Sequence, residues 1–455
     1  MNYAFGEAIS PLDGRYHGTM GPVRDAFSEL ALMRERVHVE CEHVLALDAT
    51  NVFPPLTTDE AARTRELRDT FEPQSYGIIK AIESTLRHDV KACEVYLRDQ
   101  LHLANPNRIH FGLTSEDVNN LAYSLCVQRY VRNAQLALWK RVLGTLVDLC
   151  ERFADVPWPA RTHGQHATPT TLGKEIAVVI ERLLRPYLEL EAHRFRGKLN
   201  GATGNYSAFV SAAPEVDWRA YEKAFVERLG CDQNPATTQI EDCDSIGAYL
   251  HITAQWNRVL IDFCQDVWTY ISYGYLVQRT EPGEVGSSTM PHKVNPINFE
   301  NAEGNFQLSC ALSDFIADKL SRSRMQRDLS GSTIMRNLGV ALGHHHLACE
   351  EVLRGLGRID VDAVACKAEL LAHPELLAEP IQTILRTVQG DDVYSALKSQ
   401  TRGQALGRKD LAAFVQNLGV DASVRRKLDA LSPETYVGLA PQIAREVAAR
   451  ARGFL

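Results

Sequence analysis

The sequence predicts an all-α fold with three helical regions and a long central helix bundle. Apolar residues recur at steps of three and four over unusually long stretches, and no alternating strand series is present. Several stretches far exceed the mean helix length of about 12 residues. The 455 residues are 45% apolar and 23% charged, which is ordinary for a packed globular protein. At about 100–200 residues per domain, this length predicts two to four domains.

The predicted elements follow in chain order. Residues 1–110 form an N-terminal helical domain with shorter helices, which ends at the turn-rich Asn105-Pro106-Asn107. Residues 361–455 form a C-terminal helical domain with shorter apolar groups. Between them, residues 111–360 form the long-helix bundle, with helices predicted at about 115–152, 168–196, 244–279, from Asn298 onward, and 332–357.

The limits of these helices follow from capping residues. Thr168 suits an N-cap and Pro169 the first helical position, while Pro186 is expected to kink the helix and Gly197 to end it. A heptad coiled coil would repeat more strictly, so a bundle is the better interpretation. The helices expose more apolar surface than one thin bundle covers, which predicts assembly with other copies of the chain. The family resemblance given below makes the expected assembly a tetrameric multi-helix core.

Composition excludes several classes of function. The formal net charge of −8 disfavours bulk attraction to nucleic acid or acidic membranes. The sequence contains no run of about 18 apolar residues and no basic-then-apolar start, so neither a transmembrane helix nor a signal peptide is predicted. The ten cysteines form no CxxC motif and predict reduced core residues in a cytoplasmic protein.

The most distinctive segment that interrupts the helices is 283–296. It combines glycines with two hydroxyls at Ser287 and Ser288, a positive charge at Lys293 and an amide at Asn295. A predicted helix follows, whose N-terminal N–H groups attract anions. This combination suits a site that stabilises a carboxylate as it gains charge. The alternative, a flexible linker, does not need these residue types at fixed places.

A second segment, 161–169, lies just before a predicted helix. Its His163 is a candidate general acid because imidazole titrates near neutral pH. The alternative is a histidine that stabilises a turn. A zinc site made by His163 and His166 is disfavoured, because no Cys or Glu lies nearby in the sequence.

Other polar segments are ambiguous when taken alone. Residues 87–91 place charges on one helix face, which is usually a solvated surface. Residues 114–120 open a helix with hydroxyls followed by acids, which is typical of helix capping. Residues 322–336 form either a phosphate clamp or a basic turn on the surface. The run 344–346 of three histidines lies in a predicted helix, so its members point in different directions and cannot converge on one metal.

Together these segments carry a family resemblance. Gly286-Ser287-Ser288-Thr289-Met290-Pro291-His292-Lys293-Val294-Asn295-Pro296 resembles the GSSxMPxKxNP signature of the fumarase/aspartase superfamily. Within it, four blocks resemble the longer bacterial branch of the adenylosuccinate lyase family: 10–16, 88–91, 237–241 and 326–329. Arg87 and His166 depart from that branch, which usually has a smaller polar residue and a proline at these positions.

The resemblance implies a C–N lyase that releases fumarate by β-elimination. Its substrates would be adenylosuccinate, which gives AMP, and succinylaminoimidazole carboxamide ribotide in purine biosynthesis. Ser287 matches the base that removes the carbon proton, and His163 matches the acid that protonates the leaving nitrogen. A serine can act as a base only where positive charge and N–H dipoles favour its alkoxide.

The resemblance also implies the residues that hold the substrate. They are Arg15, Tyr16, Arg87, His88, Asp89, Thr114, Ser115, Gln239, Ser288, Lys293, Asn295, Asn301, Arg327, Ser332 and Arg336. It implies a homotetramer with active sites shared between subunits, and no metal or organic cofactor. Two alternatives stay open. Another lyase of the superfamily, such as argininosuccinate lyase, would not need the clamp at Arg327, Ser332 and Arg336. A catalytically silent scaffold could lack the base or the acid.

Overall fold

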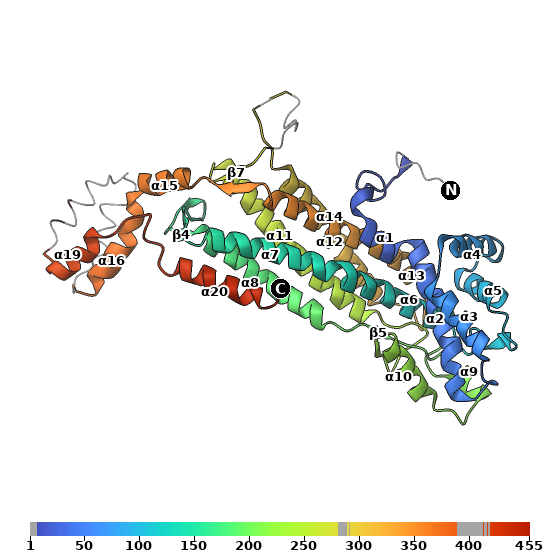
Figure 1. Cartoon of the computed structure of the whole chain (residues 1–455). Helices are drawn as coiled ribbons and strands as arrows, with labels where there is room; N and C mark the ends of the chain where they lie inside the picture. The colour runs from blue at the N-terminus through green and yellow to red at the C-terminus, as the bar shows by residue number, and fades with distance from the viewer. Residues whose placement is uncertain (1–6, 281–288, 291, 389–412, 414–415, 417–418) are drawn as a thin grey trace. The chain divides into compact units, whose positions relative to one another are not determined.

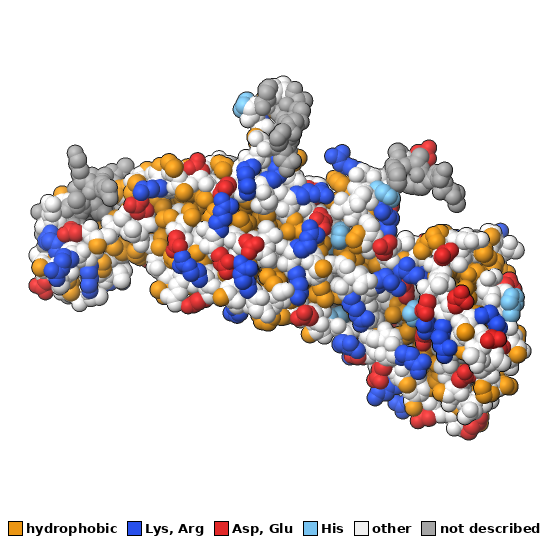
Figure 2. Space-filling view, viewed as in Figure 1, with side chains coloured by type: hydrophobic (Ala, Val, Ile, Leu, Met, Phe, Trp, Pro, Cys, Tyr) orange, Lys and Arg blue, Asp and Glu red, His pale blue; other side chains and the backbone are white. Residues whose placement is uncertain are grey.

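The computed structural model describes residues 7–280, 289–290, 292–388, 413, 416 and 419–455 (Figure 1). Among them, helices dominate and strands occur only as short two-stranded ladders, which confirms the all-α prediction. No helix in these ranges is both long enough and apolar enough to cross a membrane. On the face seen in Figure 2, basic and acidic side chains are mixed.

The described residues group into two compact units. The first comprises Met1–Trp139, Pro186–Arg258 and Gly304–Glu350, and the second comprises Lys140–Arg185, Val259–Glu303 and Glu351–Leu455. The limits between them fall inside five helices: α7 (Leu136–Arg152), α8 (Leu172–Ala192), α11 (Asp244–Ser272), α12 (Ile297–Leu320) and α14 (Leu338–Leu356). The three consecutive domains stay a prediction.

The first unit contains the remaining N-terminal and middle elements. They are η2 (His17–Thr19), α1 (Gly21–Phe27), α2 (Glu29–Ala46), η3 (Leu47–Thr50), α3 (Thr58–Asp69), α4 (Pro73–Leu86), α5 (Asp89–Leu101), η4 (Pro106–Arg108), α6 (Ser115–Tyr130), the π-helical η5 (Val131–Gln135), β5 (Arg196–Gly197), α9 (Ser207–Ala212), α10 (Trp218–Arg228), β6 (Asp232–Gln233) and α13 (Ser330–Met335). One apolar core includes Val37 of α2, Ile79 of α4 and Leu97 of α5, and α4 and α5 lie side by side in Figure 1.

A polar cluster lies inside the same unit. The indole rings of Trp139 and Trp256 stack with centroids 4.0 Å apart. Trp139 Nε1–H donates to His345 Nε2 at 2.9 Å, and the other ring nitrogen of His345 lies 2.6 Å from Asn257 Oδ1. His344 instead bonds Asn305. The adjacent histidines therefore contact different partners in the core, as their predicted helical directions require.

The second unit contains the C-terminal elements and three small ladders. They are β1 (Pro157–Trp158), β2 (Arg161–Thr162), β3 (Gln165–His166), β4 (Thr170–Thr171), β7 (Leu276–Gln278), β8 (Ile359–Val361), α15 (Ala363–Ala372), η6 (Pro374–Leu377), α16 (Ala378–Arg386), α19 (Ala422–Asp429) and α20 (Ala440–Arg452). The pairs β1–β4, β2–β3 and β7–β8 are all antiparallel. Leu377, Ile381 and Val424 belong to an apolar core between α16 and α19.

Several predicted helix limits are wrong, and strand pairing explains them. The helix expected from Thr168 begins at Leu172, because Thr170 and Thr171 pair with β1. The helix expected to reach 279 ends at Ser272, because residues 276–278 pair with β8. Gly197 ends no helix: it lies in β5, where an added Cβ would meet Leu121 at 2.5 Å.

Candidate active site

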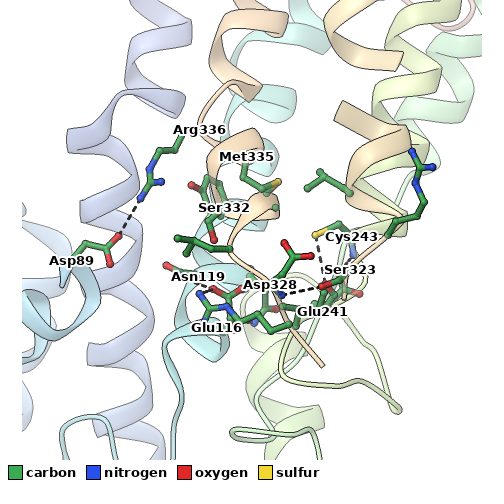
Figure 3. Close-up of a pocket in the computed structure, with 18 of the residues that line it drawn as sticks. Asp89, Glu116, Asn119, Glu241, Cys243, Ser323, Asp328, Ser332, Met335 and Arg336 are labelled. Carbon is green, nitrogen blue, oxygen red and sulfur yellow. Dashed lines mark hydrogen bonds and ion pairs between the residues drawn. The ribbon is translucent and has the colours of Figure 1, made fainter. Parts of the chain in front are cut away.

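A pocket in the first unit gathers four of the predicted substrate-binding residues. Asp89, Arg327, Ser332 and Arg336 all line it. Asp89 is the first residue of α5, Ser332 lies on α13, and Arg336 follows α13 directly (Figure 3). The remaining walls come from α2, α6, the segment 240–243 and the end of α12 with the loop that follows it. Helices therefore hold most of the side chains that face the pocket.

The guanidinium of Arg327 is fixed by two partners from other elements. Its Nη2 lies 2.9 Å from Glu116 Oε1, and its Nη1 donates to Gln239 Oε1 at 3.1 Å. Gln239 in turn donates to the carbonyl of Ala202 at 3.0 Å. Two predicted substrate-binding residues, Arg327 and Gln239, are thus in direct contact. This chain of bonds fixes the direction of a planar group that can bind an anion bidentately.

Asp89 lies between two arginines. Its Oδ2 is 2.7 Å from Arg36 Nη2 and 3.8 Å from Arg336 Nη2, the pair marked in Figure 3. Burial raises the pKa of the Asp89 carboxyl, but the charge of Arg36 and the hydrogen bonds it accepts outweigh burial, so the pKa lies below its ordinary value. Asp89 is therefore a carboxylate that neutralises Arg36 more than Arg336.

The two residues before Asp89 form the turn between α4 and α5. Arg87 has a left-handed φ of 54°, and its N–H donates to Glu83 O at 2.7 Å. His88 is the N-cap of α5, and its Nδ1 accepts from Lys91 N at 3.2 Å. Both side chains are exposed and neither is among the residues that line the pocket. Their predicted contact with substrate stays a prediction.

Thr114 and Ser115 stand at the N-terminus of α6, where Asp117 organises the backbone. Asp117 Oδ2 accepts from Thr114 N at 2.8 Å, and Oδ1 accepts from Asn200 N at 3.0 Å. Asp117 is fully buried and pairs with the equally buried Lys198, whose Nζ lies 2.9 Å away. The structure therefore supports the capping role of this segment, while its contact with a carboxylate stays a prediction.

The predicted residues near the N-terminus lie apart from the pocket lining. Arg15 is exposed, and its guanidinium carbon is 5.7 Å from the centroid of the Tyr16 ring. Tyr16 immediately precedes η2 and is half-buried. Neither residue lines the pocket.

His163 lies in the second unit, at the tip of the β2–β3 hairpin. Arg161 pairs with His166 and Thr162 with Gln165, which leaves His163 and Gly164 as a two-residue turn. Both have positive φ, 53° and 72°, as a type I′ hairpin turn requires. A left-handed φ at a non-glycine residue is strained and is enriched at functional sites. The imidazole is exposed, so it is available to a ligand.

The distinctive loop is only partly described. Ser287 and Ser288 lie outside the described residues. Lys293 is exposed, and its N–H donates to Met290 O at 3.1 Å. Asn295 precedes α12 and Asn301 lies in its second turn, both half-buried. The helix begins at Ile297, one residue before its predicted start.

The sequence analysis did not identify Arg36 as a residue of the site. The one feature in the sequence that could have indicated it is a charged residue among the apolar residues of a helix. Its side chain is 5% exposed, and its Nε donates to Asn119 Oδ1 at 2.9 Å in addition to the Asp89 pair. Glu241 also lines the pocket, in a segment quoted only for its resemblance. Burial and the neighbouring Asp242 raise the pKa of the Glu241 carboxyl, even though Asn234 donates to it.

Comparisons with known families match most of the chain. A family model described as Lyase matches residues 14–307, and one described as Adenylosuccinate lyase C-terminal matches residues 323–437. The adenylosuccinate lyase of Legionella pneumophila (strain Corby) is 43% identical over 446 residues, covering 96% of this chain and 98% of that protein. That of Escherichia coli (strain K12) is 41% identical over 442 residues, covering 95% and 97%.

Solved structures with lower identity share the fold. The 3-carboxy-cis,cis-muconate lactonizing enzyme from Pseudomonas putida has a TM-score of 0.76 at 21% identity, covering 95% of this chain and 97% of that chain. A fumarate lyase from Mesorhizobium sp. BNC1 has a TM-score of 0.76 at 18% identity, covering 94% and 97%. At these identities the likeness shows the fold alone.

Proposed function

The chain belongs to the adenylosuccinate lyase family, and we propose that it eliminates fumarate from adenylosuccinate to give AMP. We propose the same reaction on succinylaminoimidazole carboxamide ribotide, which yields aminoimidazole carboxamide ribotide in de novo purine biosynthesis. The observation that carries the proposal is 43% identity to a named adenylosuccinate lyase over 96% of this chain. The arginine-lined pocket supports a phosphate-bearing substrate.

The reaction makes three chemical demands. A base removes a proton from the carbon next to a carboxylate, and the electron pair moves into that carboxylate as a doubly charged aci-form. The C–N bond then breaks, the electron pair of the bond passes to nitrogen, and an acid supplies a proton. Donors with positive charge or N–H dipoles must hold the transient extra charge.

We assign the proton transfers to Ser287 and His163. The position of His163 supports the role of acid, because the two-residue turn fixes the backbone from which its exposed imidazole projects. Lys293 and Asn295, together with the N-terminus of α12, supply charge and N–H groups for the carboxylates. Thr114 and Ser115 add further donors.

We assign the nucleotide part to the pocket of the first unit. Arg327 presents a guanidinium oriented by Glu116 and Gln239, and Ser332 adds a hydroxyl. Arg336 is 59% exposed and only loosely paired with Asp89, so a phosphate can reach it. Bidentate recognition of phosphate favours arginine over lysine.

We propose that the enzyme works as a cytoplasmic homotetramer whose active sites combine segments of several subunits. Exposed apolar side chains on long helices support assembly: Trp268 on α11 and Leu308 and Phe315 on α12. All ten cysteines lie among the described residues, and none of them forms a disulfide. This pattern is typical of a reducing compartment. Sedimentation of the purified protein tests the assembly.

A coupled absorbance assay tests the activity with adenylosuccinate, argininosuccinate and aspartate side by side. We expect turnover of adenylosuccinate alone, and turnover of argininosuccinate alone would overturn the assignment. Ser287→Ala should abolish turnover while the oligomer still sediments as the wild type does. Ser272→Ala, an exposed serine at the end of α11, is the matched control and should remain active.

A further inference from the structure

A cluster of metal-ligating side chains lies in the second unit. None of its members is assigned to the elimination, although His166 stands on the same β2–β3 hairpin as His163. His166 on β3, Glu369 on α15 and His373 just after α15 each place one ligand atom within 4.8 Å of the others. The two imidazole rings stack with centroids 3.6 Å apart. Nε2 of His166 lies 3.4 Å from Glu369 Oε1, and Nε2 of His373 lies 3.9 Å from the same oxygen.

We propose that His166, Glu369 and His373 form a binding site for a transition-metal dication of the Zn²⁺ class. Two imidazoles and one carboxylate are a known zinc ligand set that leaves a fourth position for water. Tetrahedral bonds of about 2.0–2.2 Å put ligand atoms about 3.4 Å apart. Nε2 of His166 already lies at that distance from Glu369 Oε1, whereas binding must draw Nε2 of His373 in from 3.9 Å and separate the two stacked rings. The site is additional to the elimination, whose proton transfers and charge stabilisation we assign to other residues.

The environment of His373 favours a ligand role. Its Nδ1 lies 2.8 Å from Glu375 Oε1, so Nδ1–H donates to that carboxylate. In that tautomer Nε2 carries a lone pair that a metal can use, and it lies 3.9 Å from Glu369 Oε1. Metal-bound histidines commonly donate their second ring nitrogen to a carboxylate, which fixes the tautomer and strengthens the ligand. Glu369 lies in the last turn of α15 and His373 is the residue that caps this helix, so the end of one helix brings both side chains to the site.

A cationic side chain already contacts the proposed carboxylate ligand. Arg161 Nη2 donates to Glu369 Oε1 at 3.0 Å, and the Tyr275 hydroxyl donates to the same oxygen at 3.2 Å. A metal must share Glu369 with the positive charge of Arg161, which weakens its binding. Arg161 therefore competes with the metal, and its removal should strengthen binding rather than weaken it.

This opposite effect separates a metal site from a simple hydrogen-bonded cluster. In a cluster without metal, the stacked histidines are held by Glu369 and Glu375 alone, and none of these residues influences metal affinity. In a metal site, His166 and His373 donate to the ion, Glu375 orients one of them, and Arg161 opposes it. The direction in which each of four single variants should change the metal affinity is therefore fixed before the experiment.

The experiment uses the full chain after treatment with a chelator. Co²⁺ alone is added and its visible absorption is followed, and Zn²⁺ binding is measured by calorimetry. We expect one ion per chain, and at least a hundredfold weaker affinity in His166→Gln and in His373→Asn. Glu375→Gln should weaken binding by about tenfold, and Arg161→Gln should tighten it. His102→Asn, which changes an exposed histidine of the first unit, should bind as the wild type does.

The proposal is wrong if the wild type binds no ion at micromolar concentration. It is also wrong if His166→Gln and His373→Asn bind as tightly as the control. Circular dichroism and sedimentation check that each variant is folded. Should His166→Gln fail to fold, His373→Asn decides the question, because its side chain is partly exposed and replaceable.

Discussion

Lys198 and Asp117 form a fully buried ion pair whose disruption has a calculable cost. Lys198 Nζ lies 2.9 Å from Asp117 Oδ1 and also donates to Gly201 O at 3.0 Å. The carboxylate accepts three further backbone bonds, from Thr114, Asn200 and Gly201. It thereby joins the N-terminus of α6 to the segment after β5. Lys198→Met keeps most of the side-chain volume but removes the positive charge.

The magnitude follows from what remains after the change. A buried charge left without its partner costs about 3–5 kcal/mol. The backbone donors still hold the Asp117 carboxylate, so we expect Lys198→Met to lower the free energy of unfolding by about 3 kcal/mol, the lower end of that range. Asp117→Asn removes the compensating charge and leaves the ammonium with neutral carbonyl acceptors only, so we expect a cost near the upper end, about 5 kcal/mol.

Urea denaturation followed by tryptophan fluorescence measures these costs at one fixed protein concentration, since assembly contributes to stability. Lys223→Met is the matched control, because Lys223 is exposed and lies 3.9 Å from Glu227, and it should cost under about 0.5 kcal/mol. The double variant of Lys198 and Asp117 should cost less than the sum of the singles. A Lys198→Met cost equal to that of Lys223→Met would refute the reasoning.

Further predictions concern the pocket, a close backbone approach and a buried histidine. Arg327→Lys replaces the planar guanidinium by an ammonium and so loses one charge-assisted hydrogen bond to the substrate, which is worth about 1.5–3 kcal/mol. KM for adenylosuccinate should therefore rise about 10- to 150-fold in steady-state kinetics. Gly204→Ala places a Cβ 2.3 Å from Thr237 O at a φ of +75°, so thermal denaturation should show a lower Tm. Burial lowers the pKa of His43 to about 3 in the folded state. As the pH falls below about 6.5, the imidazole is therefore protonated in the unfolded state before it is protonated in the folded state. The free energy of unfolding should fall between about pH 6.5 and pH 3, by up to about 1.4 kcal/mol per pH unit. His43→Gln should flatten urea midpoints measured across that range, and an unchanged pH profile would contradict it.

The long helices could be predicted because their periodicity is a local property of the chain. The continuous run from α6 through η5 to α7 matches the predicted stretch at 115–152. Helix ends failed where a distant segment decides them. Thr168 and Pro169 look like a helix start, but nothing near them reveals that Thr170 and Thr171 pair with residues 157–158. Non-local pairing of this kind leaves no periodic signal in so short a strand.

The site shows the same division between local and non-local information. The residues alone left 322–336 as either a phosphate clamp or a surface basic turn, and 87–91 as charges on a helix face. The family resemblance assigned Asp89, Arg327 and Arg336 to the substrate. Arg36 was missed, since no spacing connects it with Asp89. A zinc site made by His163 and His166 was disfavoured because no Cys or Glu was near in sequence. In the folded chain Glu369 of α15 and His373, the residue after this helix, lie near His166, although they follow it by about two hundred residues.

The pocket that we assign to the nucleotide shows how a chain with a net charge of −8 can offer positive groups to an anion. Arg36, Arg327 and Arg336 each already face a carboxylate, so phosphate binding would be an exchange of partners rather than a gain of new contacts. The exchange is easiest at Arg336, because its partner Asp89 is 3.8 Å away and is already neutralised by Arg36 at 2.7 Å. It is harder at Arg327, which Glu116 holds at 2.9 Å. Arg36 therefore acts through Asp89: by neutralising that carboxylate, it leaves Arg336 as the guanidinium most available to a phosphate, while Arg327 provides a fixed direction for the rest of the substrate.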